Sequence, residues 1–263
     1  MTRIVAPAKL TVSLQVTGVR ANGYHELRAE MVALSLADEL RIDESRRGFS
    51  VTAAAGTRVE WIGDEGDNLV TRALDAVGRS ALVHLTKRIP IGGGLGGGSS
   101  DAAAILRWAR CSDPAIALGL GSDVPFSVVG GRALVEGIGE VVTPLEYERR
   151  DFVLLIPPFG VTTALVYAAY DAPNHKGHST DESSARNDLT DAALAVEPRL
   201  ARWRDVLGDL TGREPVLAGS GSTWFVEGRL DTQSGATSSF VSSGDESAQL
   251  LSVHSVDAGW NGD

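Results

Sequence analysis

The chain has 263 residues, a net charge of −10 at neutral pH and a hydrophobic content of 43%. This length and hydrophobicity allow one large domain or two small ones with a real core, and the acidic balance argues against nucleic acid as a partner. An acidic protein that binds phosphates must gather its positive potential locally, from helix N-termini and a few Lys or Arg side chains.

No stretch of the sequence indicates a membrane or an oxidising compartment. The first residues lack the apolar core of a signal peptide, and no run approaches the roughly 18 apolar residues of a membrane span. The lone Cys111 cannot form an internal disulfide, fits a reducing cytosol and is most simply a small buried apolar residue. We therefore expect a cytoplasmic protein without a membrane partner.

The N-terminal region predicts strands joined by turns. Apolar residues alternate over Leu10–Val16, the turn signal Asn22-Gly23 follows, and a second strand is expected over 30–43. Phe49–Ala53 and Val59–Ile62 are weaker strand candidates. This part of the chain is therefore expected to form antiparallel hairpins.

A glycine-rich loop lies between a predicted strand and a predicted helix. Asn68 caps a helix over 69–77, and the strand Val83–Ile89 then leads into six glycines within the seven residues from Gly92 to Gly98. A further helix is expected over 102–109. Glycine lets the backbone approach a ligand closely, and a helix start offers free N–H groups and a positive dipole end. Together these elements predict an anion site, and the usual anion is phosphate.

The loop differs from the common phosphate-binding patterns. A P-loop needs Lys directly after its last glycine, where this chain has Gly98 or Ser99. Gly92, Gly94 and Gly97 satisfy the dinucleotide pattern, but such a glycine-rich run meets many patterns, and the N-terminal hairpins are not the βαβ context it requires. A flexible linker is the remaining alternative, and linkers are rarely flanked so tightly by a strand and a capped helix.

The second half of the chain predicts short helices and strands. Strands are expected over Ser127–Val129 and Ala133–Val142, and the apolar run Phe152–Ile156 predicts a buried strand just after a domain boundary at residue 150. Helices are expected over 162–170, from 187 and over 199–207, with a mobile polar loop over 171–186. Beyond Arg229 the chain is rich in Ser, Gly, Thr and Asp, which is typical of a weakly folded tail.

Three segments in this order resemble the three motifs of the GHMP small-molecule kinases. They are Pro7-Ala8-Lys9-Leu10, the loop from Pro90 to Ser100, and Gly219-Ser220-Gly221-Ser222-Thr223. Within that superfamily the segments 22–27, 67–69 and 120–126 look like the family of 4-diphosphocytidyl-2-C-methyl-D-erythritol kinases. The resemblance covers roughly residues 3 to 226.

The resemblance implies an α+β fold of two lobes with the ligands in the cleft between them. Residues 1–150 would form an ATP-binding lobe like ribosomal protein S5 domain 2, residues 151–228 a ferredoxin-like lobe, and residues 229–263 a divergent, poorly ordered tail. It implies transfer of a phosphoryl group from ATP, accompanied by Mg²⁺, to the 2-hydroxyl of a cytidine-diphosphate-linked methylerythritol in the non-mevalonate isoprenoid pathway. A monomer and a homodimer both stay open.

The resemblance also assigns residues to roles. Lys9 and Asp123 match the catalytic pair, with Asp123 as the base. The residues matched to ATP binding are Pro90, Gly92, Gly93, Gly94, Leu95, Gly96, Gly97, Gly98, Ser99, Ser100, Asn68 and Lys87. Those matched to the acceptor are Tyr24, His25, Tyr167, Thr11, Gly221 and Ser222, with the aromatic rings holding the cytosine; no residue is matched to a metal.

Plainer interpretations of these residues stay open on the sequence alone. Asp123 and Asn68 fit helix caps, Lys9 and Lys87 fit solvent-facing strand lysines, and Tyr167 fits a core position. The loop 219–223 also fits an ordinary turn between strands.

The chain also departs from the family pattern. Thr11 stands where the family commonly has Asn, Ser222 replaces a usual Pro, and the segment between 104 and 121 is short. Two other functions remain: a different GHMP kinase, such as a mevalonate-type or homoserine kinase, and a catalytically impaired nucleotide-binding relative.

Overall fold

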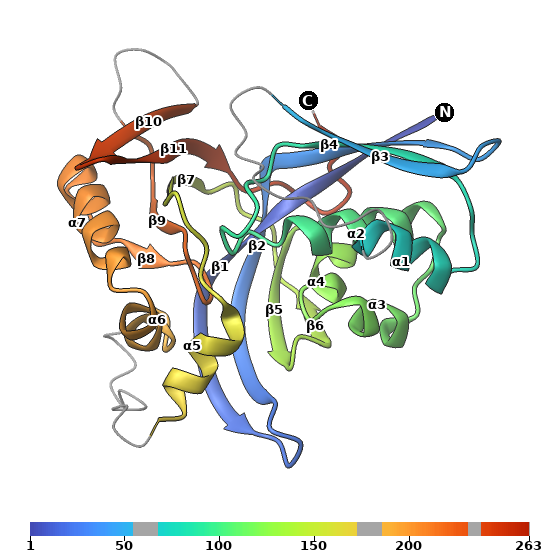
Figure 1. The fold of residues 1–263 in the computed structure, drawn as a ribbon. Coiled ribbons are helices and arrows are strands. Elements are labelled where there is room, and N and C mark those ends of the chain that lie inside the picture. The colour runs from blue at the N-terminus through green and yellow to red at the C-terminus, as the bar shows by residue number, and fades with distance from the viewer. Residues whose placement is uncertain (55–67, 173–185, 231–237, 263) are drawn as a thin grey trace.

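The computed structural model describes residues 1–54, 68–172, 186–230 and 238–262. The chain forms two lobes, each built on one β-sheet with helices packed against it (Figure 1). In the described parts of the chain, no helix is both long and apolar enough to cross a membrane.

The N-terminal lobe is organised around a long hairpin. Its strands are β1 (Thr2–Val19), β2 (His25–Asp43), β3 (Gly48–Ala53), β4 (Leu82–Lys87), β5 (Arg132–Gly137) and β6 (Val141–Pro144). The sheet has the order β3-β4-β2-β5-β6, and β1 also pairs with β2; all pairs are antiparallel except β3 with β4. The alternation predicted around Leu10 and the turn at Asn22-Gly23 are therefore confirmed.

Four helices pack on this sheet. They are α1 (Leu69–Ala76), α2 (Gly97–Trp108), α3 (Pro114–Leu120) and α4 (Val124–Val129). Asn68 caps α1, as predicted, and the buried face of α1 consists of Val70, Ala73 and Leu74. The central helix α2 is buried from Ser100 to Leu106, so the start of this helix is fixed by close packing.

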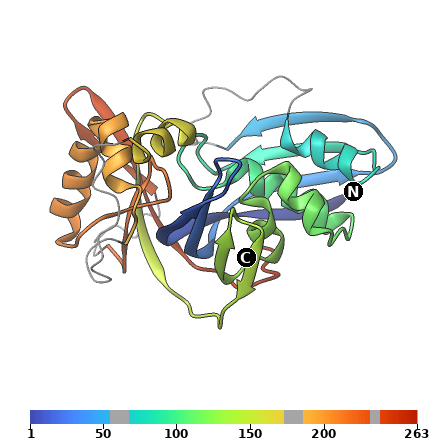
Figure 2. The ribbon, with the colours of Figure 1, turned by 90° about the horizontal axis from the view of Figure 1, so that it is seen from below.

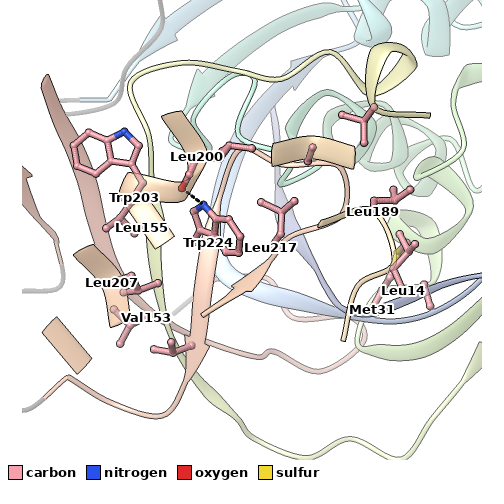
Figure 3. Packing of buried hydrophobic residues seen from close by; sticks show 14 of the residues in the cluster. Leu14, Met31, Val153, Leu155, Leu189, Leu200, Trp203, Leu207, Leu217 and Trp224 are labelled. Atoms are coloured by element: carbon pink, nitrogen blue, oxygen red, sulfur yellow. Dashed lines mark hydrogen bonds between the residues drawn. The ribbon is translucent and has the colours of Figure 1, made fainter. Parts of the chain in front are cut away.

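The C-terminal lobe begins with β7 (Asp151–Ile156). Its other strands are β8 (Val216–Leu217), β9 (Trp224–Glu227), β10 (Ser238–Ser243) and β11 (Glu246–His254), in the order β10-β11-β7-β9-β8. Its helices are α5 (Thr163–Tyr170), α6 (Thr190–Val196) and α7 (Arg199–Thr211). Trp203 and Trp224 are fully buried, and the indole of Trp224 donates to the carbonyl of Leu200 at 3.1 Å (Figure 3).

The two lobes share a hydrophobic core. Leu14 and Met31 of the long hairpin belong to the same buried cluster as Leu155 and Trp224 of the second sheet (Figure 3). The backbone of Leu14 exchanges two hydrogen bonds with the segment 186–188, at 2.9 and 3.0 Å. The two lobes are therefore packed against each other through one continuous core.

The expectation of a poorly ordered tail is wrong for the described residues beyond 237. Strand β11 pairs with β7 from Gln249↔Ile156 to His254↔Asp151, and Ala248, Leu250 and Leu251 are buried. The chain then returns to the N-terminal lobe, where Asn261 accepts from Arg3 at 3.1 Å (Figure 2). A few apolar residues on both faces of β11 carry this packing, within a segment that is otherwise rich in Ser and Gly.

Two shorter predictions also need correction. Ser127–Val129 lies in helix α4, because Pro125 occupies the first turn of a helix, where proline needs no N–H partner. Helix α2 begins at Gly97, ahead of the expected residue 102, and its first residue packs closely on Lys87 and Ile89, which lie 3.1 and 3.2 Å from the Cβ position of Gly97. The strand expected over 59–62 and most of the loop expected over 171–186 fall outside the described residues.

We predict that Leu250→Ala lowers the free energy of unfolding by about 2–4 kcal/mol, because it truncates a side chain buried in the same hydrophobic cluster as Leu155 and Trp203. Phe240→Ala on the neighbouring strand is the control, since this ring is 57% exposed and its truncation should change stability by less than about 0.5 kcal/mol. Urea unfolding monitored by tryptophan fluorescence measures both. Equal midpoints for Leu250→Ala and the wild type would contradict the packing of β11.

Candidate active site

The three segments singled out in the sequence meet at one place. The N–H of Lys9 on β1 donates to the carbonyl of Leu95 at 3.0 Å. The hydroxyl of Thr223 donates to the carbonyl of Gly93 at 2.6 Å, and its N–H reaches the same oxygen at 3.3 Å. The glycine loop is thus held between β1 of one lobe and the loop 219–223 of the other.

The glycines of this loop are required by its neighbours. Gly92, Gly94 and Gly96 have φ angles of 78°, 76° and 67°. A Cβ atom on Gly94 would lie 2.5 Å from the carbonyl oxygen of Gly221, and one on Gly96 would lie 2.6 Å from Cγ of Lys9. Leu95 between them is only 1% exposed and anchors the loop in the core. The loop therefore combines left-handed backbone with contacts that no side chain would allow.

The start of α2 offers backbone donors. Gly96 is its N-cap and provides no side-chain bond, and the first intrahelical bond runs from the N–H of Ser100 to the carbonyl of Gly96 at 2.9 Å. The N–H groups of Gly97, Gly98 and Ser99 therefore precede the helical ladder and are free to bind an anion. Ser100 is different, because its hydroxyl donates to the carbonyl of Pro7 at 2.6 Å and ties α2 to β1.

Lys9 and Asp123 form an ion pair beside this loop. Nζ of Lys9 lies 3.4 Å from Oδ2 of Asp123 and donates to Oγ1 of Thr11 at 3.1 Å. Asp123 stands at the N-cap position of α4, but its side chain makes no capping hydrogen bond and is 29% exposed. The carboxylate thus has not been used as a helix cap, and it is held by the buried ammonium of Lys9.

Aromatic side chains line the space beyond Asp123. The rings of His25 and Tyr167 stack with centroids 4.6 Å apart and planes 27° apart, and Nε2 of His25 lies 2.7 Å from Oδ1 of Asp171. Burial and the negative charge of Asp123 raise the pKa of Tyr167 to about 12, so this phenol is neutral at physiological pH. Tyr24 is 60% exposed on the turn of the long hairpin. These residues bring the hairpin turn and α5 together.

Four of the predicted binding residues are occupied by protein contacts. Asn68 accepts from the N–H of Val70 at 2.7 Å as a helix cap, and Ser222 donates to the carbonyl of Phe159 at 2.7 Å. Ser100 is bound to Pro7 as described. Lys87 is 5% exposed, and its ammonium pairs with Asp38 and Asp101 inside the lobe. The side chain of Lys87 is therefore buried inside the lobe, and its ammonium is not available to bind a ligand on the glycine loop.

Two residues outside the sequence motifs also shape the site. Asp38 is fully buried and accepts from the N–H groups of Arg88 and Ile89 at 2.5 and 2.8 Å. Asn187 donates to the carbonyls of Leu217 and Gly219 at 2.8 and 2.7 Å and supports the loop 219–223. A charged residue within the apolar run of β2 was the available signal for Asp38.

This arrangement and the comparisons define the class of protein. The sequence profile described as the N-terminal domain of GHMP kinases matches residues 68–131, which include the glycine loop and Asp123. A crystal structure of mevalonate kinase superimposes with a TM-score of 0.55 over 98% of this chain and 100% of that chain, and at 13% identity it shows a shared fold. The chain is a GHMP-type kinase.

More similar relatives identify the branch. A 4-diphosphocytidyl-2-C-methyl-D-erythritol kinase of Nitrosomonas eutropha is 35% identical over 252 residues, covering 86% of this chain and 88% of the relative. The enzyme of the same name from Anaeromyxobacter is 36% identical over 84% of this chain and 80% of its own length. A crystal structure of 4-(cytidine 5'-diphospho)-2C-methyl-D-erythritol kinase matches with a TM-score of 0.66 and 32% identity, over 85% of this chain and 89% of the other. The chain therefore belongs to the 4-diphosphocytidyl-2-C-methyl-D-erythritol kinase family.

We predict that Gly94→Ala lowers the free energy of unfolding by more than about 2 kcal/mol and abolishes nucleotide binding, because its Cβ would meet the Gly221 carbonyl. Gly119→Ala is the matched control, since nothing lies within 4 Å of its Cβ position and its backbone lies in helix α3. Thermal unfolding and ATP titration report the two effects. A Gly94→Ala protein with wild-type values in both would show that the loops do not touch.

Proposed function

We propose that this chain transfers the γ-phosphoryl group of ATP to the 2-hydroxyl of 4-diphosphocytidyl-2-C-methyl-D-erythritol, in the non-mevalonate isoprenoid pathway of the cytoplasm. The observation that carries the proposal is the Lys9–Asp123 ion pair, which has the glycine loop on the Lys9 side and the stacked rings of His25 and Tyr167 on the Asp123 side. A kinase of this class needs all three parts: a phosphate cradle, a group that receives a proton, and a surface that holds the acceptor.

ATP binds in this proposal with its phosphates on the glycine loop. The N–H groups of Gly97, Gly98 and Ser99 and the dipole of the twelve-residue helix α2 supply positive potential to an otherwise acidic chain. Pro90, Gly92 and the other loop residues shape this cradle through their backbone. Asn68 and the end of β4 border it on the adenosine side, where backbone groups make the contact because both predicted side chains are occupied.

Mg²⁺ accompanies ATP and takes most of its ligands from phosphate oxygens. The protein offers hard oxygen donors that fit such an ion. The hydroxyl of Ser99 lies 3.7 Å from the Cβ position of Gly121, so it borders the short turn that carries Asp123. The Ser99 hydroxyl would hold the ion against the nucleotide, where its charge offsets that of the phosphates.

Asp123 acts as the base in the proposed reaction. The substrate hydroxyl loses its proton to Asp123 as its oxygen forms a bond to the γ-phosphorus, and the bond from that phosphorus to the bridging oxygen of ADP breaks. Lys9 keeps the carboxylate in place and offers a positive charge beside the transferring group, while Thr11 holds the ammonium from the other side. Thr11 thus supports the site through Lys9 rather than by reaching the acceptor.

The cytosine of the acceptor binds against the aromatic residues. His25 stacks on Tyr167 of α5, whose hydroxyl feels the charge of Asp123, and Tyr24 lies next to His25 on the exposed hairpin turn, so the outer faces of these rings are open to the cytosine. Gly221, with a φ of 95°, lets the loop 219–223 approach both the glycine loop and the acceptor. The aromatic pair is the feature that favours a cytidyl acceptor over the small alcohols of other GHMP kinases.

One assay separates the candidate functions. Release of ADP is measured with ATP, Mg²⁺ and a panel of alcohols that contains the cytidyl substrate, mevalonate and homoserine. We expect turnover with the cytidyl substrate alone. Turnover with mevalonate or homoserine instead would identify another GHMP kinase, and nucleotide binding without any turnover would identify an impaired relative.

We predict that Asp123→Asn lowers kcat by about 10²–10⁴-fold, because the amide cannot accept the hydroxyl proton. The affinity for ATP should change little, because the phosphates bind to the loop and helix. Asp75→Asn on the exposed face of α1 is the control and should keep the wild-type kcat. A near-normal kcat for Asp123→Asn would show that another group takes the proton.

A further inference from the structure

A buried charge cluster lies directly beneath the glycine loop. Lys87 at the end of β4 pairs with Asp38 of β2 and, at 2.8 Å, with Asp101 of α2. All three residues are at most 5% exposed. Burying three charged groups is costly, and their mutual pairing offsets part of that cost; Oδ1 of Asp101 is the one carboxylate oxygen of the cluster that is buried without a hydrogen-bond partner. We call these three residues the buried triad.

Asp38 of the triad holds the segment that leads into the glycine loop. Oδ1 of Asp38 accepts from the N–H groups of Arg88 and Ile89, which are the last two residues before Pro90. Strand β4 ends at Lys87, so these two N–H groups are bound by the Asp38 carboxylate instead of by a neighbouring strand. Asp38 therefore sets the direction in which the chain enters the glycine loop.

Lys87 and Asp101 of the triad hold the start of α2, which follows the glycine loop. Nζ of Lys87 lies 3.1 Å from the Cβ position of Gly97, the first residue of α2, and it is bonded to Asp101 in the following turn. Lys87 thus touches the helical turn whose free N–H groups face the anion site. A displacement of the Lys87 side chain would therefore shift the end of β4 relative to the start of α2.

We propose that Asp38, Lys87 and Asp101 are positioning residues, which hold both ends of the glycine loop in the geometry that binds the triphosphate. This inference rests on the proposed function, because it takes the phosphates of ATP to be the ligand of the loop. None of the three side chains reaches the nucleotide; they act through the backbone of Arg88, Ile89 and Gly97.

The charge balance of the triad agrees with a place beneath an anion site. With both carboxylates ionised, the triad would carry one net negative charge and repel the phosphates. Burial raises the pKa of Asp101 well above its usual range, more than the Lys87 ammonium lowers it, which favours the neutral acid. Burial alone would lower the pKa of Lys87, but Asp101 and Asp38 hold it above its ordinary value, so Lys87 stays charged. Both pKa shifts favour the protonated forms of Asp101 and Lys87, which reduces the negative charge beneath the glycine loop.

The test compares two buried cations. Lys87→Met removes the centre of the triad, and Arg150→Met removes a largely buried cation that pairs with Glu30 and Glu227 away from the loop. Binding of ATP with Mg²⁺ is measured by calorimetry without any acceptor, and melting temperature is measured in parallel. We expect Lys87→Met to weaken ATP binding by about tenfold or more, and Arg150→Met to lower the melting temperature while changing ATP affinity by less than about twofold.

A conservative pair tests the triad from the helix side. Asp101→Asn keeps an oxygen for Lys87 and adds no charge, so it should retain far more ATP affinity than Asp101→Leu, which leaves Lys87 without its helix partner. This pair also decides the matter if Lys87→Met does not fold.

Three outcomes would overturn the inference. They are wild-type ATP affinity in Lys87→Met, equal loss of affinity in Lys87→Met and Arg150→Met, and equal affinity in Asp101→Asn and Asp101→Leu. Failure of the proposed function would look different, since the wild-type protein itself would then fail to bind ATP or to turn over the cytidyl substrate.

Discussion

The structure depends on the close contact of three chain segments: β1 at Lys9, the glycine loop and the loop 219–223. The carbonyl of Gly93 accepts from Thr223 of the C-terminal lobe, and the carbonyl of Leu95 accepts from Lys9 of the N-terminal lobe. Such an arrangement is possible only where the central segment has no side chains, because Gly94 and Gly96 leave no room for a Cβ atom. The loop is therefore as much a joint between the lobes as a place for phosphate. A change in the relative position of the lobes would alter the anion site directly.

The proposed phosphate site of this acidic chain contains few free cations. Lys9 is committed to Asp123 and Thr11, and Lys87 is committed to the buried triad, so backbone N–H groups and the α2 dipole carry most of the attraction. The direction of those dipoles then matters more than the number of lysines. This makes the supports of the loop as important as the loop itself, and it explains why charged groups are buried where a hydrophobic packing would be less costly.

The sequence predicts the site better than its supports. The meeting of Lys9 with Asp123 follows from motif order, and the strand, loop and helix around the glycines follow from local patterns. Lys87 shows a limit of matching by motif. The family resemblance assigned it to ATP binding, but it follows the alternation of the buried residues Val83 and Leu85 and therefore faces the core. Its partner Asp38 lies 49 residues earlier, and no local pattern joins the two.

The C-terminal segment shows how composition can hide a structural role. Its strand β11 pairs with β7, and the chain then binds the long hairpin at Ser35 and Ala33, through the N–H groups of His254 and Val256 at 3.1 and 2.9 Å. These contacts lie in the middle of β2, which carries His25 at one end and Asp38 near the other. The C-terminal segment thus binds the middle of β2, the strand that carries both His25 of the aromatic stack and Asp38 of the buried triad. Only a handful of apolar residues are needed for this, because most of its hydrogen bonds come from the backbone, whose pairing depends little on side-chain identity.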